Sequence, residues 1–159
     1  MKQKIVKTMV YEGLGFPIRL NNVPMIKIRG EWVPHINYNS LQESVLLHLC
    51  HKKTPLTGSE IAFIRQYFAM TTTEFGKRFG CSHVAVLKWE KYRNNFARIA
   101  PTTEVCIRLF VFLKLSQKAH AFKNLYMEID IPNLTKCLKD AEKTTILALN
   151  VQEDALFAA

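Results

Sequence analysis

The chain has 159 residues, of which 48% are hydrophobic and 22% charged, so we expect one folded domain or two small ones and exclude wholesale disorder. Its 22 lysines and arginines against 13 acidic residues give a net charge of +9, which favours a polyanionic partner, nucleic acid above all. No run approaches the roughly 20 apolar residues of a membrane span, and no apolar secretory segment follows the basic start. We therefore expect a soluble, cytoplasmic protein that does not act on membranes.

The basic excess is concentrated in the middle third of the chain. Residues 52–98 contain nine basic and three acidic side chains, whereas residues 99–159 contain seven of each. We expect the anionic partner to bind this middle third.

The cysteines form no metal-binding pattern. Cys50, Cys81, Cys106 and Cys137 lie 31, 25 and 31 residues apart, so no CxxC pair is present. Two disulfides would be possible by number, but nothing else suggests secretion, and we interpret the four as small buried hydrophobic residues. His48 and His51 lack a third ligand nearby. We predict no metal and no cofactor.

The first segment, 8–36, favours extended structure. Phe16–Leu20 is a short apolar run, Asn21-Asn22 a predicted turn, and 25–29 alternates apolar and basic residues before a turn at 29–31. This pattern predicts a small antiparallel sheet. Leu41, Val45, Leu46 and Leu49 then predict a helix over 38–51.

Three short helices with clear start signals follow. Thr57 with Glu60, and Thr71 with Glu74, each form an S/T-x-x-E capping box, and Ser82 is suited to cap a helix over 83–91. The first helix should end near Ala69.

Two of these helices, joined by a tight turn, predict a helix-turn-helix. Gly76 allows close packing, Gly80 makes the corner, and Val86 fills the junction. We assign Ser82, Trp89 and Glu90 to structure as well, with Glu90 either pairing with Arg65 or capping neighbouring amides. The second helix would then present its first turns to the major groove of DNA.

The remainder predicts helices over 102–115 and 116–126, a strand over 127–131 and a helix over 134–148. We therefore expect a mainly α fold. Its parts are an N-terminal β-hairpin segment plus helix (1–53), a five-helix-type helix-turn-helix DNA-binding domain (54–115), and a short C-terminal α/β extension (116–159) that serves dimerisation.

Residues 57–115 resemble the helix-turn-helix domain of the Cro/C1 (XRE) family of prokaryotic DNA-binding regulators. The matching residues are Ile64-Arg65, Phe68, Met70–Gly76, Phe79–Ser82, Val86–Glu90, Pro101, Ile107, Leu109 and Leu113. The family usually has a glycine just after the position of Glu90, whereas Lys91 to Asn95 follow here. Asparagine can take the left-handed conformation in place of glycine.

The resemblance implies a role for each exposed residue near the turn. His83, Val84 and Lys88 occupy positions that face base edges, with Lys88 the best candidate to read guanine. Backbone phosphates would be bound by residues around the motif, which are Thr71, Thr72, Thr73, Lys77, Arg78, Lys91, Arg93, Asn94 and Arg98. Such proteins usually bind palindromic double-stranded DNA as homodimers.

The leader, in Tyr11, Gly13–Pro17 and Asn22–Met25, resembles regulators related to the MqsA/YgiT-type antitoxins. Those antitoxins carry a zinc module built from CxxC pairs, which this chain lacks. Because this zinc module is missing, an antitoxin that binds its own promoter and a toxin protein is kept as the alternative function only. No catalytic motif is present, so we do not expect an enzyme. A protein-binding adaptor or an RNA-binding protein is less favoured.

Overall fold

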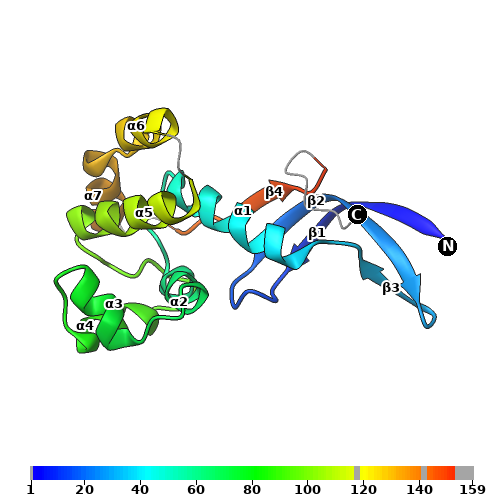
Figure 1. Ribbon diagram of the computed structural model, residues 1–159, viewed down its shortest axis with the longest axis horizontal. Coiled ribbons are helices and arrows are strands. Elements are labelled where there is room, and N and C mark those ends of the chain that lie inside the picture. Colours follow the sequence, from blue (N-terminus) through cyan, green and yellow to red (C-terminus); the bar gives the residue numbers. More distant parts are fainter. Residues whose placement is uncertain (1, 117–118, 141–142, 153–159) are drawn as a thin grey trace. The chain divides into compact units, whose positions relative to one another are not determined.

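The computed structural model describes residues 2–116, 119–140 and 143–152, and it divides the chain into two compact units (Figure 1). The sheet unit comprises residues 1–45 and 146–159, and the helical unit comprises residues 46–145. The boundary lies inside α1 (Tyr38–Cys50), after Val45. The units thus divide the chain differently from the ranges 1–53, 54–115 and 116–159 proposed from sequence.

The sheet unit is built on one long central strand. Its strands are β1 (Gln3–Tyr11), β2 (Ile18–Ile28), β3 (Glu31–Pro34) and β4 (Leu147–Asn150). β1 and β3 pair with β2 in antiparallel fashion, while β4 pairs with β2 in parallel, with Ile18 opposite Leu147. The N–H of Val151 extends this last pairing by donating to Asn21 O at 2.8 Å.

The expected mainly α fold is wrong. The four strands form a mixed sheet, and its parallel pair joins the end of the chain to the N-terminal strands. The sheet is therefore more than a small N-terminal segment, and residues 146–152 belong to it rather than to a separate C-terminal α/β extension. Pairing across more than 120 residues cannot be read from local periodicity.

The turn predicted at Asn21-Asn22 is also wrong, since both residues lie inside β2. Asn22 does adopt the left-handed conformation, with φ of 56°. The alternation of buried and exposed residues along β2 shifts by one position at Asn22. The buried residues are Ile18 and Leu20 before Asn22, and Val23 and Met25 after it. The turn at 29–31 is confirmed, with Gly30 at φ of 88°.

The helical unit contains the last five residues of α1 (46–50) and, within the described residues, six further helices. These are α2 (Gly58–Tyr67), α3 (Thr72–Arg78), α4 (His83–Glu90), α5 (Pro101–Leu115), α6 (Ala119–Glu128) and α7 (Ile131–Lys139). The helices predicted over 38–51, 83–91 and 102–115 are confirmed to within a residue at each end. α6 and α7 pack against α5, which is why α5 is apolar on more than one side.

Two predictions fail after α6. The strand expected over 127–131 is wrong, because α6 continues to Glu128 and Asp130 caps α7, accepting a hydrogen bond from the Asn133 N–H at 3.0 Å. The helix expected over 134–148 starts and ends earlier, at Ile131 and Lys139, and β4 takes its last residues. Pro132 is compatible with a helix start, since the first-turn amides have no intrahelical acceptor. Residues 141–142 of this prediction lie outside the described residues.

Within the described part of the chain, no helix combines the length and apolar character required to cross a bilayer.

Candidate nucleic-acid interface

Side-chain caps define the start of each helix in the segment 57–90. Thr57 Oγ1 accepts from the Glu60 N–H at 3.2 Å while the Glu60 carboxylate accepts from the Thr57 N–H, and Thr71 with Glu74 repeats this arrangement. Ser82 Oγ accepts from the Ala85 N–H at 3.1 Å. Both predicted capping boxes and the predicted N-cap are confirmed, so the ends of these helices are set by local sequence.

The corner between α3 and α4 depends on two glycines. A Cβ atom on Gly76 would lie 2.5 Å from the carbonyl oxygen of Cys81, so the chain can pass this close only where a side chain is missing. The Cys81 N–H donates to Gly76 O at 2.8 Å. Gly80 has φ of 70°, in the left-handed region. The sequence-based roles of both glycines are confirmed.

Buried side chains support α4 from beneath. Phe75 and Val86 are fully buried and Trp89 is 9% exposed. Arg65 Nε donates to Glu90 Oε1 at 2.5 Å and Arg65 Nη2 to Glu90 Oε2 at 3.2 Å. Arg65 Nη1 also donates to Met70 O at 3.0 Å, so one guanidinium ties together α2, the segment before α3 and the end of α4. This predicted ion pair orients α4.

The opposite side of α4 is exposed. At about 100° per residue, His83, Val84, Leu87, Lys88 and Lys91 fall within an arc of about 140°. All five are exposed, and the two apolar members are 60% (Val84) and 44% (Leu87) exposed. The predicted base-facing residues therefore lie on one solvent-facing side, where a helix of roughly 10–12 Å diameter can enter a groove about 12 Å wide.

The Glu74 carboxylate already lies at the N-terminus of α3, where it accepts from the Thr71 N–H. The Thr71 side chain and N–H are both used in the capping box, and these hydrogen bonds lower the pKa of the Glu74 carboxyl. A phosphate at this end would meet the negative charge of Glu74. Of the three threonines predicted to contact phosphate, Thr71 is thus the one already used in the capping box.

The six other proposed backbone contacts are all exposed. They are Lys77, Arg78, Lys91, Arg93, Asn94 and Arg98. The side chains of two of them also have partners inside the unit, since Arg78 Cζ lies 5.2 Å from the Phe110 ring centroid and Arg98 Nη1 donates to Leu138 O at 3.4 Å. Lys77, Lys91 and Arg93 are left as the freest of the charged side chains around α4.

The loop after α4 differs from the sequence-based expectation. Arg93, rather than an asparagine, takes the left-handed conformation, with φ of 51°. The Ser59 N–H donates to Arg93 O at 2.8 Å, and a Cβ atom on Gly58 would lie 2.7 Å from Arg93 N. The strain at Arg93 is imposed by this close approach of the loop to the start of α2.

Sequence reasoning missed a group of buried charges in the same unit. Lys52 Nζ lies 2.9 Å from Glu60 Oε2, and Arg108 Nη2 lies 2.6 Å from Glu104 Oε2. Burial raises the pKa of the Glu104 carboxyl, against the lowering effects of Arg108 and the Leu56 N–H. The available signal was the i,i+4 spacing of Glu104 and Arg108 within a largely apolar helix.

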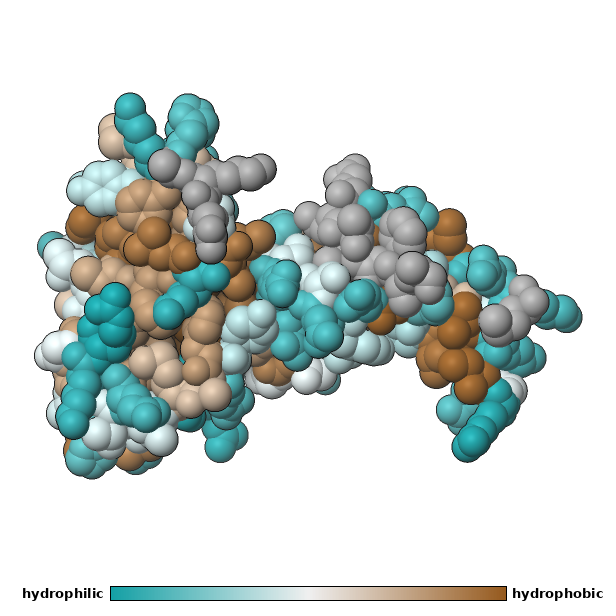
Figure 2. Space-filling view, in the orientation of Figure 1, coloured by the Kyte–Doolittle hydropathy of each residue, from teal (hydrophilic) through white to brown (hydrophobic). Residues whose placement is uncertain are grey.

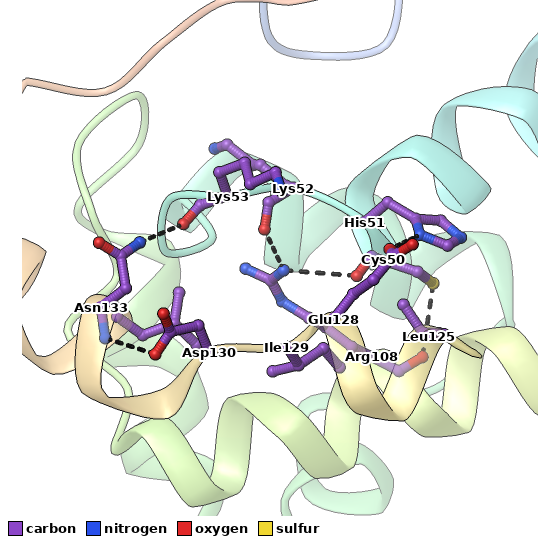
Figure 3. Close-up of a pocket in the computed structure, with 11 residues that line it drawn as sticks. Cys50, His51, Lys52, Lys53, Arg108, Leu125, Glu128, Ile129, Asp130 and Asn133 are labelled. Carbon is purple, nitrogen blue, oxygen red and sulfur yellow. Dashed lines mark hydrogen bonds and ion pairs between the residues drawn. The ribbon is translucent and has the colours of Figure 1, made fainter. Parts of the chain in front are cut away.

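His51, for which no metal role was predicted, contacts a carboxylate (Figure 3). Its Nδ1 lies 2.7 Å from Glu128 Oε2. Across the described ranges, no three His, Cys, Asp or Glu side chains gather in a way that would hold a metal ion.

Comparison with known proteins returned no match from family models, curated proteins or solved structures.

Proposed function

We propose that the chain is a sequence-specific double-stranded DNA-binding regulator of the Cro/C1 type, and that it inserts α4 into the major groove. The single observation that carries the proposal is the exposed side of α4, held out by a buried junction and the Arg65–Glu90 pair. Such a side has no packing role within the described helical unit.

Charge supports a nucleic acid as the partner. The helical unit contains sixteen lysines and arginines and eight acidic residues. Three of those acidic residues, Glu60, Glu90 and Glu104, are already paired internally with Lys52, Arg65 and Arg108. Removing these three pairs leaves thirteen basic and five acidic residues, so the same excess of +8 remains outside the internal pairs, as expected of a surface that neutralises phosphates.

In this proposal His83, Val84 and Lys88 contact base edges, with Lys88 donating to guanine. Lys77, Lys91 and Arg93 contribute most to phosphate binding. A cytoplasmic location accompanies this role.

A homodimer on a palindromic site is part of the proposal, because one short helix reads few bases and two-fold pairing doubles the site. Exposed apolar side chains of the α5–α7 region support self-association, namely Leu113, Tyr126, Met127 and Ile131. Hydrophobic surface is visible where Figure 1 draws α5 (Figure 2). The homodimer is tested by measuring the molar mass of the protein in solution by sedimentation equilibrium.

The proposal is tested by selecting from a pool of genomic DNA fragments at two salt concentrations. Wild-type protein should enrich one palindromic sequence, and enrichment should fall steeply with salt. Lys88→Ala should lose the sequence preference, whereas the sheet-unit control Lys27→Ala should keep it. Binding without a preferred sequence would reduce the proposal to a non-specific nucleic-acid binder, and absence of binding would refute it in favour of a protein partner, such as a toxin.

A further inference from the structure

The sheet unit has one long strand edge that no described strand covers. β1 (Gln3–Tyr11) is nine residues long and pairs with β2 on one side only, so the backbone N–H and C=O groups directed to its other side have no partner strand within the described sheet (Figure 1). The opposite side of β2 is covered by two strands of four residues each, β3 and β4. A long open edge is a template for pairing with another chain.

β1 lacks most of the features that protect such edges, which are a proline, a β-bulge or a very short strand. It contains no proline, and its register with β2 stays constant from one end to the other, so no residue is inserted as a bulge. None of its residues is buried, and the side chains of Ile5 and Val10 are 61% and 54% exposed. Charge remains, in Lys4 and Lys7, and a partner strand must accommodate both lysines.

A second copy of β1 accommodates both lysines in one register. Two copies paired antiparallel about a two-fold axis place residues of the same parity opposite each other, because the outward-directed backbone groups belong to every second residue. The two registers that pair nearly the whole strand have the axis at Lys7 or at Thr8. An axis at Lys7 would set the two Lys7 side chains opposite each other, which is unfavourable. An axis at Thr8 sets Lys7 opposite Met9 of the other copy.

The register centred on Thr8 also gives Lys4 an acidic partner. Lys4 lies opposite Glu12 of the other copy, the residue directly after β1, and the two-fold axis repeats this pair. Neither residue forms an ion pair with another described residue of its own chain. Opposite charges that face each other across two strands stabilise the pairing, so the strand is complementary to itself in charge.

The remaining pairs of this register are apolar. Ile5 lies opposite Tyr11 of the other copy, and Val6 lies opposite Val10. A pair of an aromatic and a β-branched side chain stabilises antiparallel strands. Pairing would therefore cover the two most exposed apolar side chains of β1, Ile5 and Val10.

We propose that two copies of the chain associate through β1, as an antiparallel pair centred on Thr8 that joins their two sheets into one. The inference rests on the homodimer of the proposed function and gives that homodimer an interface. The exposed apolar side chains of α5–α7 are the other candidate surface. The pairing uses no residue of α4, so self-association and DNA contacts are separable by mutation.

A disulfide across the two-fold axis is the first test. Directly opposite residues of an antiparallel pair have Cα atoms about 4.5–5.5 Å apart, within the range of a disulfide. The full-length protein carries Cys81→Ser and Cys106→Ser, which remove the two thiols that are not buried. In this background Thr8→Cys should form a covalent dimer on air oxidation, read by non-reducing electrophoresis.

Gln3→Cys in the same background is the matched control, at an exposed position of the same strand. In the proposed register its two copies are ten positions apart along the paired strands, or about 30 Å at roughly 3.3 Å per residue. It should therefore form no covalent dimer.

Charge reversal tests the register in the non-covalent dimer. Lys4→Glu sets carboxylates opposite each other, and Glu12→Lys sets ammonium groups opposite each other, twice per dimer in each case. Each variant should raise the dimer dissociation constant at least about fivefold, measured by sedimentation equilibrium. The double variant restores opposite charges and should return to within about twofold of wild type. Lys27→Glu, at an exposed position of β2, makes the same change of charge outside the pairing and should dimerise like wild type.

The outcomes separate this interface from the proposed function. A dimer that Thr8→Cys does not cross-link, that Gln3→Cys cross-links equally, or that the charge reversals leave unchanged would overturn the β1 interface and leave α5–α7 as the surface of the homodimer. A chain that stays monomeric would overturn the interface and the homodimer together. DNA selection with Lys88→Ala tests base reading by α4 separately.

Discussion

The two units of this chain differ most in how they use charge. The sheet unit contains six basic and five acidic residues, and the helical unit contains sixteen and eight. Nearly all of the net charge of +9 therefore belongs to the unit that contains α3 and α4. The basic character is thus a property of one unit and not of the whole chain.

The units also differ in their interiors. The buried polar and charged residues of the described chain are Lys52, Thr57, Glu60, Glu104 and Arg108, and all belong to the helical unit. The buried positions of the sheet unit are hydrophobic, as in Ile18, Leu20 and Val23. The helical unit should therefore be the more sensitive one to loss of a single polar partner, because an uncompensated buried charge costs far more than a lost apolar contact of similar size.

The largest expected effect tests this difference directly. Glu104→Ala leaves Arg108 without its carboxylate and the Leu56 N–H without its acceptor, and should lower the free energy of unfolding by about 3–5 kcal/mol. Urea unfolding followed by Trp89 fluorescence in a Trp32→Phe background measures it within the helical unit. Glu43→Ala, at an exposed position of α1, should change the value by less than about 0.5 kcal/mol. An effect of Glu104→Ala no larger than that of Glu43→Ala would show that the buried ion pair contributes no more than an exposed charge, and would contradict the sensitivity expected of the helical unit.

The next effect concerns the corner of the helix-turn-helix. Gly76→Ala places a methyl group 2.5 Å from Cys81 O and 3.1 Å from Ser82 O, both backbone atoms. We expect a loss of about 1–3 kcal/mol in unfolding free energy, because backbone must move to make room. Thermal unfolding measures this loss. Gly15→Ala in the sheet unit is the variant to compare with Gly76→Ala. No atom lies within 4 Å of the added methyl group at Gly15, so only the left-handed backbone (φ of 94°) opposes that change. An unchanged stability of Gly76→Ala would show that the α3–α4 approach is looser than described.

The next prediction concerns the free energy of DNA binding, for which we expect an effect of comparable or smaller size. Lys88→Ala should weaken binding to the selected DNA by about 1–3 kcal/mol and relax the preference at one base pair. Lys91→Ala should instead weaken binding to all sequences alike and reduce the slope of log affinity against log salt by about 1. Fluorescence anisotropy at several salt concentrations separates the two. Equal loss from Lys27→Ala, in the sheet unit, would contradict the placing of the interface on α4.

The smallest effect concerns the thiols. Burial raises the pKa of Cys50 to about 12, from an ordinary value of 9.0, whereas Cys106 is exposed. Between these two values the unfolded chain binds fewer protons than the folded one at Cys50, so this group's contribution makes stability fall as pH rises from about 9 towards 12. Labelling with iodoacetamide at pH near 9, read by mass spectrometry, should modify Cys106 first and leave Cys50 protected. Equal labelling of both would contradict the burial of Cys50.

Local features were predictable and distant pairings were not. The capping boxes of Thr57 and Thr71, the cap at Ser82 and the corner at Gly76 and Gly80 depend on residues within a few positions of one another, and all of them are present. The Arg65–Glu90 pair was one of the two roles expected for Glu90, and it is present.

The parallel strand β4 failed because its four residues gain strand structure only by pairing with β2, far away in sequence. The apparent strand at 127–131 failed for the opposite reason, since its alternation is accidental and the cap at Asp130 decides the local structure. The buried Glu104–Arg108 pair was overlooked because a single sequence does not show that α6 and α7 would cover that side of α5.

The most direct measurement is protection of guanine N7 from dimethyl sulphate methylation in the selected DNA, because N7 lies on the major-groove edge that Lys88 is proposed to contact. Wild-type protein should protect guanines in both half-sites of the palindrome. Lys88→Ala, at a concentration that restores full occupancy, should lose protection at one guanine in each half-site and keep the others. Unaltered guanine reactivity in the presence of saturating wild-type protein would contradict insertion of α4 into the major groove.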